Sequence, residues 1–392
     1  MVQIGRTAGR TGDPLAGQRP KPAAGGGRRL MPRAVIRSPA GRPSPGRRRL
    51  VSVIIPMYNY GHYLLETVSS VLSQDGVDVQ VIIVDDASTD DSAQIASALA
   101  DADPRVSLIT LAANGGPAAA FNRGHGDAAG EFIMRLDADD LLTPGSLARS
   151  AALFDAFPAV GLVYGHPLHF QGPVPAPVAT PVRSWTIWHG PDWVAERCRK
   201  AVNCITTPEA IIRASTLEQT GLLSTDIKVA TDIHMWLRVA AVSDVGHIEG
   251  PDQALYRLHD DSLTGRSSYT PWVDLLERKS VFDDFFAGPG ADLASAKDLQ
   301  RAANAALASE ALQHACRAYD RGRAAGFDVQ AAVDFALAAS PDAHGLPQWR
   351  ALRRRQLLGE RLAAMPPFFT GAQLGRRIHG KVQYRRWQRT GL

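Results

Sequence analysis

The fold is decided by the stretch Val79-Gln-Val-Ile-Ile-Val-Asp-Asp-Ala-Ser-Thr-Asp90. Its first half is rich in β-branched residues and predicts a buried strand, and the acidic residues that follow mark the end of that strand. Further short strands are predicted at 51–55, 106–111 and 132–136, with apolar residues at helical spacing between them. Strands that alternate with helices predict an α/β fold with a mostly parallel sheet covered by helices on both faces.

Polar side chains follow three of these four predicted strands. The first strand ends in Pro56-Met-Tyr-Asn59, the second in Asp85 and Asp86, and the fourth in Asp137-Ala-Asp-Asp140. In such sheets the ligand crevice lies at the carboxyl ends of the strands, so we expect these groups to share one crevice. Five crowded carboxylates repel one another unless a cation neutralises them. Oxygen ligands suit Mg²⁺ or Mn²⁺, and Mg²⁺ completes its shell with substrate phosphates, so the pattern favours a metal-bridged diphosphate.

Composition and charge exclude several classes of protein. Of the 392 residues, 45% are hydrophobic and 21% charged, which excludes wholesale disorder. The net charge of +4 is unevenly distributed: residues 1–50 hold 12 basic and 1 acidic residue, residues 350–392 hold 11 and 1, and residues 51–349 hold 20 and 37. An acidic body argues against nucleic-acid binding. No uncharged apolar run is long enough to predict a membrane-spanning helix. Three cysteines predict no disulfide framework, which fits a cytoplasmic location.

Three regions are predicted along the chain. Residues 1–50, rich in Gly, Pro and Arg, are expected to be a disordered basic leader, and residues 51–265 to form the α/β domain. Residues 266–392 are expected to be helical and to end in a basic tail. That tail has two interpretations. It either forms an interfacial helix that gives a peripheral contact with the inner face of an anionic membrane, or it is a solvated, frayed tail, which is the commoner case at chain ends.

The ordered motifs resemble the family 2 glycosyltransferases with the GT-A fold. The resemblance spans about residues 51–265, over half of the chain, and implies a Rossmann-like sheet that binds a nucleotide-diphosphate sugar. The matching segments are Pro56 to Asn59, Val84 to Asp90, Asn114 to Asn122, Gly130 to Asp140, Asn203 to Gly221, Thr231 to Arg238, and Tyr256 to Ser262.

The resemblance implies roles for the residues at the ends of the first two strands. Pro56, Tyr58 and Asn59 are implied to line the nucleotide pocket. Asp86, together with Asp85, is implied to accept hydrogen bonds from the base, as recognition of uracil requires.

Further roles are implied for residues that surround the sugar and the phosphates. Asn122 is implied to hold the nucleotide side, and Asp137 to face the ribose. Asp139 is implied to bind Mg²⁺ or Mn²⁺, and His259 to complete the metal or phosphate site.

The acceptor side of the site is implied to lie near the motif that begins at Thr231. Asp232 is implied to be the general base, supported by Trp236 and by Arg238, which also joins the donor-binding set. Two positions depart from the family pattern. Thr231 stands where the family usually has Glu, and Phe121 stands before Asn122 where it often has Arg.

These expectations describe a metal-dependent, inverting glycosyltransferase that uses a nucleotide sugar, with UDP as the default nucleotide. The acceptor is expected to be a saccharide or a lipid-linked molecule, as in the synthesis of cell-surface polysaccharides. Two alternatives stay open on the same fold: a non-catalytic nucleotide- or carbohydrate-binding module, and a nucleotidyltransferase. The latter usually has a basic, Gly-rich loop after the first strand, which residues 57–61 do not supply. A Gly-x-Gly-x-x-Gly motif, which dinucleotide-dependent oxidoreductases need at that position, is also absent.

Overall fold

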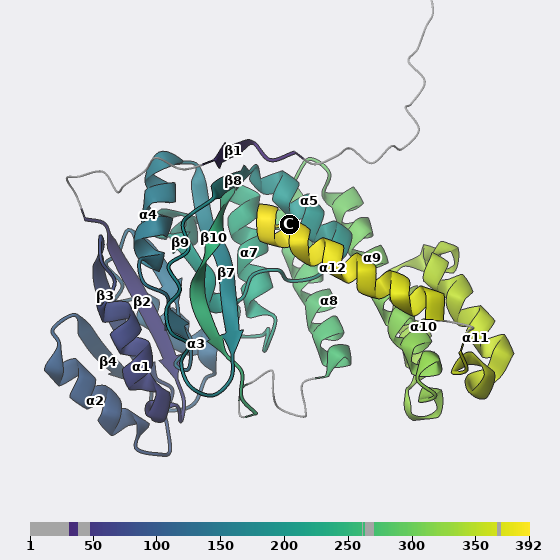
Figure 1. Cartoon of the computed structure of the whole chain (residues 1–392), viewed down its shortest axis with the longest axis horizontal. Helices are drawn as coiled ribbons and strands as arrows, with labels where there is room; N and C mark the ends of the chain where they lie inside the picture. Colours follow the sequence, from purple (N-terminus) through teal and green to yellow (C-terminus); the bar gives the residue numbers. More distant parts are fainter. Residues whose placement is uncertain (1–30, 38–47, 261, 263–269, 367–369) are drawn as a thin grey trace, which may run out of the picture. The chain divides into compact units, whose positions relative to one another are not determined.

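A mixed sheet of ten strands forms the centre of this computed structural model, which describes residues 31–37, 48–260, 262, 270–366 and 370–392 (Figure 1). The order is β1-β8-β10-β7-β9-β5-β2-β3-β4, and β6 pairs with β10 beside this path. The strands are β1 (Ala34–Arg37), β2 (Leu50–Met57), β3 (Asp78–Asp85), β4 (Val106–Thr110), β5 (Phe132–Arg135), β6 (Leu141–Leu142), β7 (Val160–Phe170), β8 (Ser184–Trp188), β9 (Ala210–Arg213) and β10 (Asp244–Arg257).

The half of the sheet formed by β5, β2, β3 and β4 is parallel, as the sequence predicts. Its strands are almost continuously apolar because helices cover both faces. Val53 and Val81 share a buried cluster with side chains of the first two helices. The third helix covers the opposite face, where a Cβ on Gly124 would lie 2.6 Å from an Ile54 methyl group, so only glycine allows this close approach. These helices are α1 (Gly61–Leu72), α2 (Ser92–Ala102) and α3 (Pro117–His125).

The other half of the sheet is mixed. β9 lies antiparallel between β5 and β7, whereas β7 and β10 pair in parallel, and β8 continues the sheet antiparallel to β10. Around it lie α4 (Ser146–Ala156), α5 (Gly190–Lys200), η1 (Thr207–Glu209), α6 (Ala214–Thr220) and α7 (Thr231–Val242). The α/β class is thus confirmed, and the crevice at the strand ends stays a prediction.

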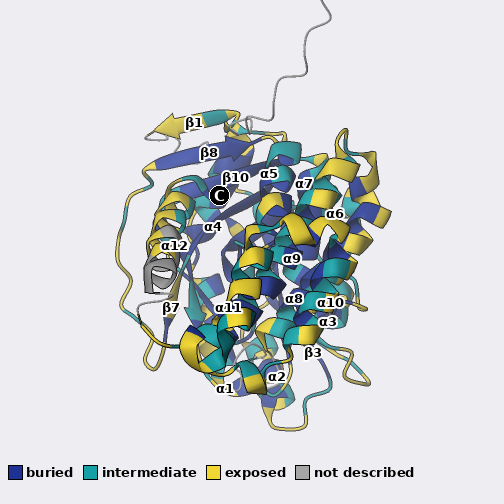
Figure 2. Cartoon of the chain, turned by 90° about the vertical axis from the view of Figure 1, so that its right-hand side faces the viewer, coloured by how far each residue is buried: buried dark blue, intermediate teal, exposed yellow. Residues whose placement is uncertain are grey.

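One segment of the expected disordered leader is ordered instead. Ala34–Arg37 forms the edge strand β1, antiparallel to β8 with Ala34 opposite Ile187. Figure 2 shows β8 as buried and β1 as mostly exposed. The expectation is therefore wrong for these four residues, because pairing with β8 supplies the order that their own sequence does not predict. Residues 1–30 and 38–47 lie outside the described part of the chain.

The C-terminal region is helical, as the sequence predicts. The long helix α9 packs against α5, α8, α10 and α11, so this region lies directly on the α/β domain (Figure 1). Its helices are α8 (Pro271–Ala287), η2 (Pro289–Asp292), α9 (Ala296–Asp320), η3 (Ala324–Gly326), α10 (Val329–Ala339), η4 (Pro341–Gly345), α11 (Pro347–Ala363) and α12 (Thr370–Thr390).

The end of α12 is docked, so the interpretation as a frayed tail is wrong. The Tyr164 hydroxyl donates to the carbonyl of Gly391 at 2.5 Å, and the Trp188 indole N–H donates to the carbonyl of Thr390 at 2.7 Å. In return, the Trp387 indole N–H donates to the carbonyl of Cys204 at 2.9 Å. Bonds from buried aromatic residues satisfy carbonyls that a helix end otherwise leaves without partners.

Contact with a membrane through α12 stays a prediction. Its middle turns expose Ile378, Val382 and Tyr384. Among the described residues, no helix combines the length and the apolar character that crossing a bilayer requires.

A buried ion pair holds α9 to α11, and its loss is expected to destabilise the fold. Arg355 donates from Nε and Nη2 to the two carboxylate oxygens of Asp320, at 2.8 and 3.1 Å, and both side chains are almost fully buried. Asp320→Asn removes the counter-charge of a buried guanidinium, so we expect a loss of about 3 kcal/mol in the free energy of unfolding, measured by urea titration. The control is Asp298→Asn in the exposed pair with Arg301 on the same helix, with an expected loss below about 1 kcal/mol. Equal losses in the two variants would contradict this prediction.

Candidate active site

The loops after β2 and β3 are joined at the carboxyl edge of the sheet. The backbone N–H of Asn59 donates to Ser88 Oγ at 3.0 Å, and the backbone N–H of Thr89 donates to Asn59 Oδ1 at 2.8 Å. Asn59 has a φ of 59°, a left-handed conformation that asparagine tolerates better than most residues. Pro56 is buried within β2, whereas Tyr58 is 38% exposed. Of the predicted pocket residues after β2, Tyr58 therefore offers the most accessible surface to a nucleotide.

Asp85 and Asp86 are both buried and bonded to backbone N–H groups. Asp85 Oδ1 accepts from Ser88, and the two oxygens of Asp86 accept from Gly115 and Gly116 at 2.8 Å each. Asp86 thus fixes the loop before α3, where Gly116 has a φ of 84°. Each carboxylate oxygen has a second lone pair, so the predicted contact of Asp86 with a base stays a prediction.

Asn122 and Arg238 converge on residues 220–223, which we call the 220–223 segment. The Asn122 amide donates to the carbonyl of Leu223 at 2.8 Å and accepts from the N–H of Leu223 at 3.0 Å. Arg238 donates to the carbonyls of Leu222, at 2.7 Å, and of Thr220. Binding of the donor by these two side chains stays a prediction, and the structure adds that both also bond to backbone groups. They position the 220–223 segment, which borders the pocket beside Asp232.

The three aspartates after β5 have different surroundings. Asp137 Oδ1 accepts from Arg135 Nε and Nη2 at 2.9 and 2.7 Å, and remains one-third exposed. Asp139 Oδ2 lies 2.8 Å from His259 Nε2. Asp140 turns inward and accepts from the N–H of Arg257 at 2.9 Å, with 2% of its surface exposed. Asp140 therefore fixes the end of β10, which leaves Asp137 and Asp139 to face the crevice.

Asp139 and His259 could hold a divalent cation together with substrate phosphates. Burial raises the pKa of the Asp139 carboxyl, and the charge of Asp137 adds to this effect, so a cation at this point would be favourable. Within the described residues, no group of three or more His, Cys, Asp or Glu side chains could hold a metal ion. A donor set of one carboxylate and one imidazole fits a cation whose other ligands are phosphate oxygens and water, as is common for Mg²⁺.

Asp232 lies in the first turn of α7, opposite the end of β5. Its Oδ1 accepts from the N–H of Ile233 at 2.7 Å, and its Oδ2 accepts from the Asn203 amide at 2.6 Å. Burial raises the pKa of Asp232 to about 6. The charge of Arg135 opposes that rise, and the charge of Asp137 adds to it. Asp232, the predicted base, and Asp137, the predicted ribose ligand, thus both interact with the guanidinium of Arg135.

Arg135, Asn203 and Glu209 complete the surroundings of Asp232, and the sequence did not single them out as site residues. Arg135 and Asp137 are two positions apart at a strand end, a spacing that predicts a shared face. Glu209 is buried and accepts from the N–H and hydroxyl of Thr206, and burial raises its pKa to about 8. The sequence signal for Glu209 is the capping box Thr206-x-x-Glu209.

A narrow pocket of about 20 Å³ opens beside Asp232. Trp236, one turn along α7, lines it, as does Leu223 of the 220–223 segment. Thr231, the position that departs from the family pattern, is buried at the start of α7. The residues that we expect to support Asp232 are therefore in place, except that Arg238 acts through the 220–223 segment.

Comparisons with known proteins agree with this geometry. Residues 52–216 match the family described as Glycosyl transferase family 2. An uncharacterized glycosyltransferase of Nostoc is 40% identical over 114 residues, which are 29% of this chain and 35% of the relative. The O-antigen biosynthesis protein RfbC of Myxococcus xanthus is 32% identical over 226 residues, 56% of this chain and 16% of the relative. The chain thus spans about a third or less of the length of these two relatives.

Solved structures agree with the fold. The structure of S. aureus TarS residues 1–349 with UDP-GlcNAc aligns with a TM-score of 0.55 and 19% identity, over 80% of this chain and 90% of that one. The same protein with UDP gives 0.53 and 17%, over 83% and 91%. At these identities the likeness concerns the fold alone, which is the one that the strand-end motifs predict. Residues 52–216 of the chain are thus similar to glycosyl transferase family 2 in sequence, and the fold agrees with that similarity.

Proposed function

We propose that the protein transfers a sugar from a nucleotide-diphosphate sugar to a hydroxyl group of a saccharide or lipid-linked acceptor, with inversion at the anomeric carbon. One observation carries the proposal: Asp232, a carboxylate with a raised pKa, is held by Asn203 near the end of β5, after which Asp137 and Asp139 follow. Such an arrangement would suit a base on one side of a sugar and a diphosphate on the other. The match of residues 52–216 to glycosyl transferase family 2 supports the same reaction class.

Asp232 is the proposed general base. An acceptor hydroxyl is nearly unreactive at neutral pH until a positioned base takes its proton. A pKa of about 6 leaves Asp232 mostly ionised at neutral pH, yet more basic than an ordinary carboxylate. The hydrogen bonds from Asn203 and Ile233 fix the direction of its oxygens. A single displacement by the activated hydroxyl inverts the anomeric centre.

The donor is proposed to bind at the carboxyl ends of β2, β3 and β5, with Tyr58 and Asp86 near the base and Asp137 near the ribose. UDP is the proposed nucleotide, supported by the TarS structures in complex with UDP and with UDP-GlcNAc. A divalent cation held by Asp139 and His259 would act as a Lewis acid on the departing diphosphate. Relatives named for O-antigen and succinoglycan biosynthesis support a saccharide acceptor.

A thermal-shift panel of nucleotide-diphosphate sugars, with and without Mn²⁺, tests this proposal. A ligand that binds only the native state and is present at a free concentration of about 100 times its Kd adds about 2.7 kcal/mol to the free energy of unfolding. This gain is readily measured as a rise in Tm. We expect a UDP-sugar to raise Tm in the presence of Mn²⁺ and to be hydrolysed slowly when no acceptor is added. Binding without any turnover would instead favour the non-catalytic module, and no shift with any donor would remove the proposal.

The pKa of Asp232 predicts a pH dependence. Because the base acts when deprotonated, kcat/KM for donor turnover should rise with pH and level off above about 6, falling about tenfold per unit below that value. Glu209, whose pKa is raised to about 8, stays mostly protonated below pH 7 and therefore adds no second transition to the pH profile of kcat/KM. Initial rates measured between about pH 5 and pH 7, at saturating metal, check this prediction. A flat profile over that range would show that Asp232 does not act as the base.

A further inference from the structure

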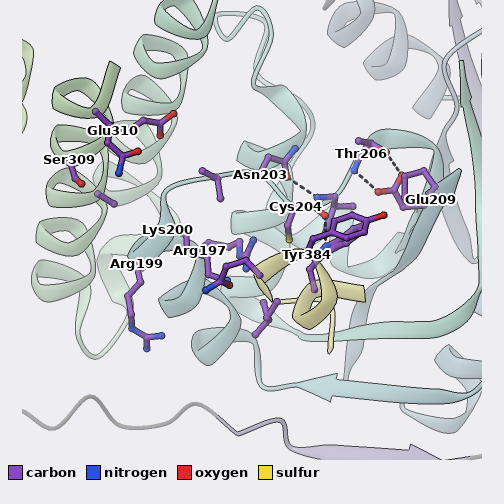
Figure 3. Close-up of a pocket in the computed structure, with 18 of the residues that line it drawn as sticks. Arg197, Arg199, Lys200, Asn203, Cys204, Thr206, Glu209, Ser309, Glu310 and Tyr384 are labelled. Carbon is purple, nitrogen blue, oxygen red and sulfur yellow. Dashed lines mark hydrogen bonds between the residues drawn. The ribbon is translucent and has the colours of Figure 1, made fainter. Parts of the chain in front are cut away.

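A large cavity lies on the acceptor side of the candidate active site. Its volume is about 850 Å³, and it lies between α5, the segment 202–206, α9 and the end of α12. Figure 3 shows Arg197 and Lys200 of α5 and Tyr384 of α12 around it, with Glu310 of α9 on the opposite wall. The strand-end crevice of the proposed donor does not include these residues.

Arg197 is the unusual residue of this cavity. It is 1% exposed, and its Nε and Nη2 have no hydrogen-bond partner among the described residues. Each of the other buried arginines of the described chain contacts a carboxylate: Arg257 contacts Glu66, Arg278 contacts Glu310, and Arg355 contacts Asp320. A buried charge without a counter-charge is costly, so the cavity side of Arg197 is suited to an anion.

The neighbours of Arg197 do not supply that anion. The Cys204 thiol interacts with Arg197, but burial raises the pKa of the thiol, which is therefore neutral at neutral pH. Burial likewise raises the pKa of Glu209 to about 8. Glu310, the other acidic residue of the lining, is bonded to Arg278 at 3.0 Å through each of its oxygens. The wall also carries His169, whose pKa burial lowers, and the cations Arg199, Lys200 and Arg317.

The cavity is connected to the proposed base through Asn203. The side chain of Asn203 lines the cavity and donates to Asp232 Oδ2 at 2.6 Å. Tyr384 and Trp387 of α12 also line it, and aromatic walls with a few placed polar groups are typical of ligand pockets. Asn203 is therefore the link between this cavity and Asp232, the carboxylate that would activate an acceptor hydroxyl and that itself lines the narrow pocket.

We propose that this cavity binds the acceptor and that the positive charge of Arg197 attracts an anionic group of it, a phosphate or a carboxylate. A guanidinium is a permanent cation that pairs well with both oxyanions. The acceptor class is thus an anionic glycan or a phosphate-bearing molecule. This inference rests on the proposed function, since it assigns the acceptor of the same reaction.

Calorimetric titration with small anions tests the inference. The probes are glycerol 3-phosphate, glucuronate and neutral glycerol, added to the full chain while the donor nucleotide found in the thermal-shift panel saturates the donor site. We expect one of the two anions to bind and glycerol to give no heat. Arg197→Gln should weaken the binding by about tenfold to a hundredfold, because the buried positive charge that attracts the anion is lost. A preference for glycerol 3-phosphate assigns a phosphate-bearing acceptor, and a preference for glucuronate assigns a uronic-acid acceptor.

A second pair of variants keeps the test decisive if Arg197→Gln does not fold. Arg317→Glu reverses an exposed charge on the cavity wall and should weaken anion binding by about threefold, whereas Arg301→Glu, on the same helix but outside the cavity, should leave the Kd unchanged. Equal Kd values for the wild type, Arg197→Gln and Arg317→Glu, or no heat with either anion, would overturn the inference. If the donor binds in that case, only the acceptor assignment fails. If no donor binds to the wild type, the proposed function fails.

Discussion

Replacement of Asp232 by Asn is expected to lower kcat for sugar transfer by about 10²- to 10⁴-fold, while the Kd of the donor stays within about twofold of the wild-type value. The substitution preserves the size of the side chain and one acceptor oxygen for the Asn203 amide, so the local packing should persist. It removes the capacity to take up a proton. The loss should therefore appear in kcat, because the missing interaction forms only in the transition state.

The matched control is Asp226→Asn, an exposed aspartate shortly before α7 that removes the same charge outside the site. It should leave kcat and the donor Kd unchanged. Rates measured with donor hydrolysis or transfer, and Kd values from calorimetry, separate the two effects. Turnover of Asp232→Asn at the wild-type rate would remove Asp232 from the mechanism, and a parallel loss of donor affinity would assign it to the donor pocket instead.

The parallel half of the sheet could be predicted from local sequence, and the mixed half could not. Val51 to Ile55 and Val79 to Val84 are short, β-branched runs flanked by polar turns, and such runs determine a buried strand wherever they pair. β9 is only four residues long and follows a 3-10 turn at Thr207–Glu209. Its place between β5 and β7 depends on strands that are distant in the sequence, and the local pattern of apolar residues does not predict such pairing.

The docking of the end of α12 could not be predicted from the sequence either, because it also depends on contacts between distant segments. The segment is basic and weakly amphipathic, so its composition is typical of a solvated tail. Its order comes from Tyr164, Trp188 and Trp387, whose hydrogen bonds join positions more than 180 residues apart. The four residues of β1 likewise gain their order from β8, which lies about 150 positions further along the chain.

The candidate site was predictable where chemistry depends on residue type, and less so where it depends on geometry. The carboxylates at two strand ends and Asp232 could be proposed from the sequence, because few other residue types suit metal binding and proton transfer. The contacts of Asn122 and Arg238 with the backbone of the 220–223 segment could not be predicted, because a motif records residue types and not their backbone partners. The unusual position of Arg197 could not be predicted from the sequence. It is distinguished only in the folded chain, where no carboxylate among the described residues pairs with it.

Asp139→Ala is expected to abolish the effect of Mn²⁺ on donor binding and to weaken the metal-supported Kd by about a hundredfold or more. We expect the two neighbouring aspartates to compensate poorly for its loss. Asp137 is bonded to Arg135, and Asp140 is buried against the N–H of Arg257. His259 would be left as the one remaining protein ligand proposed for the cation.

The measurement is calorimetric titration of the donor with and without Mn²⁺, which reports binding independently of turnover. Asp75→Ala, an exposed carboxylate in the loop between α1 and β3, is the control and should keep the full Mn²⁺ effect. If Asp139→Ala retained the metal effect, the cation would have to bind elsewhere. Because the described chain offers no group of three acidic, histidine or cysteine ligands, that site would depend on the diphosphate itself for most of its ligands. The comparison of Asp139→Ala with Asp232→Asn then separates the two halves of the proposed reaction, since the first should act on donor affinity and the second on the rate of transfer.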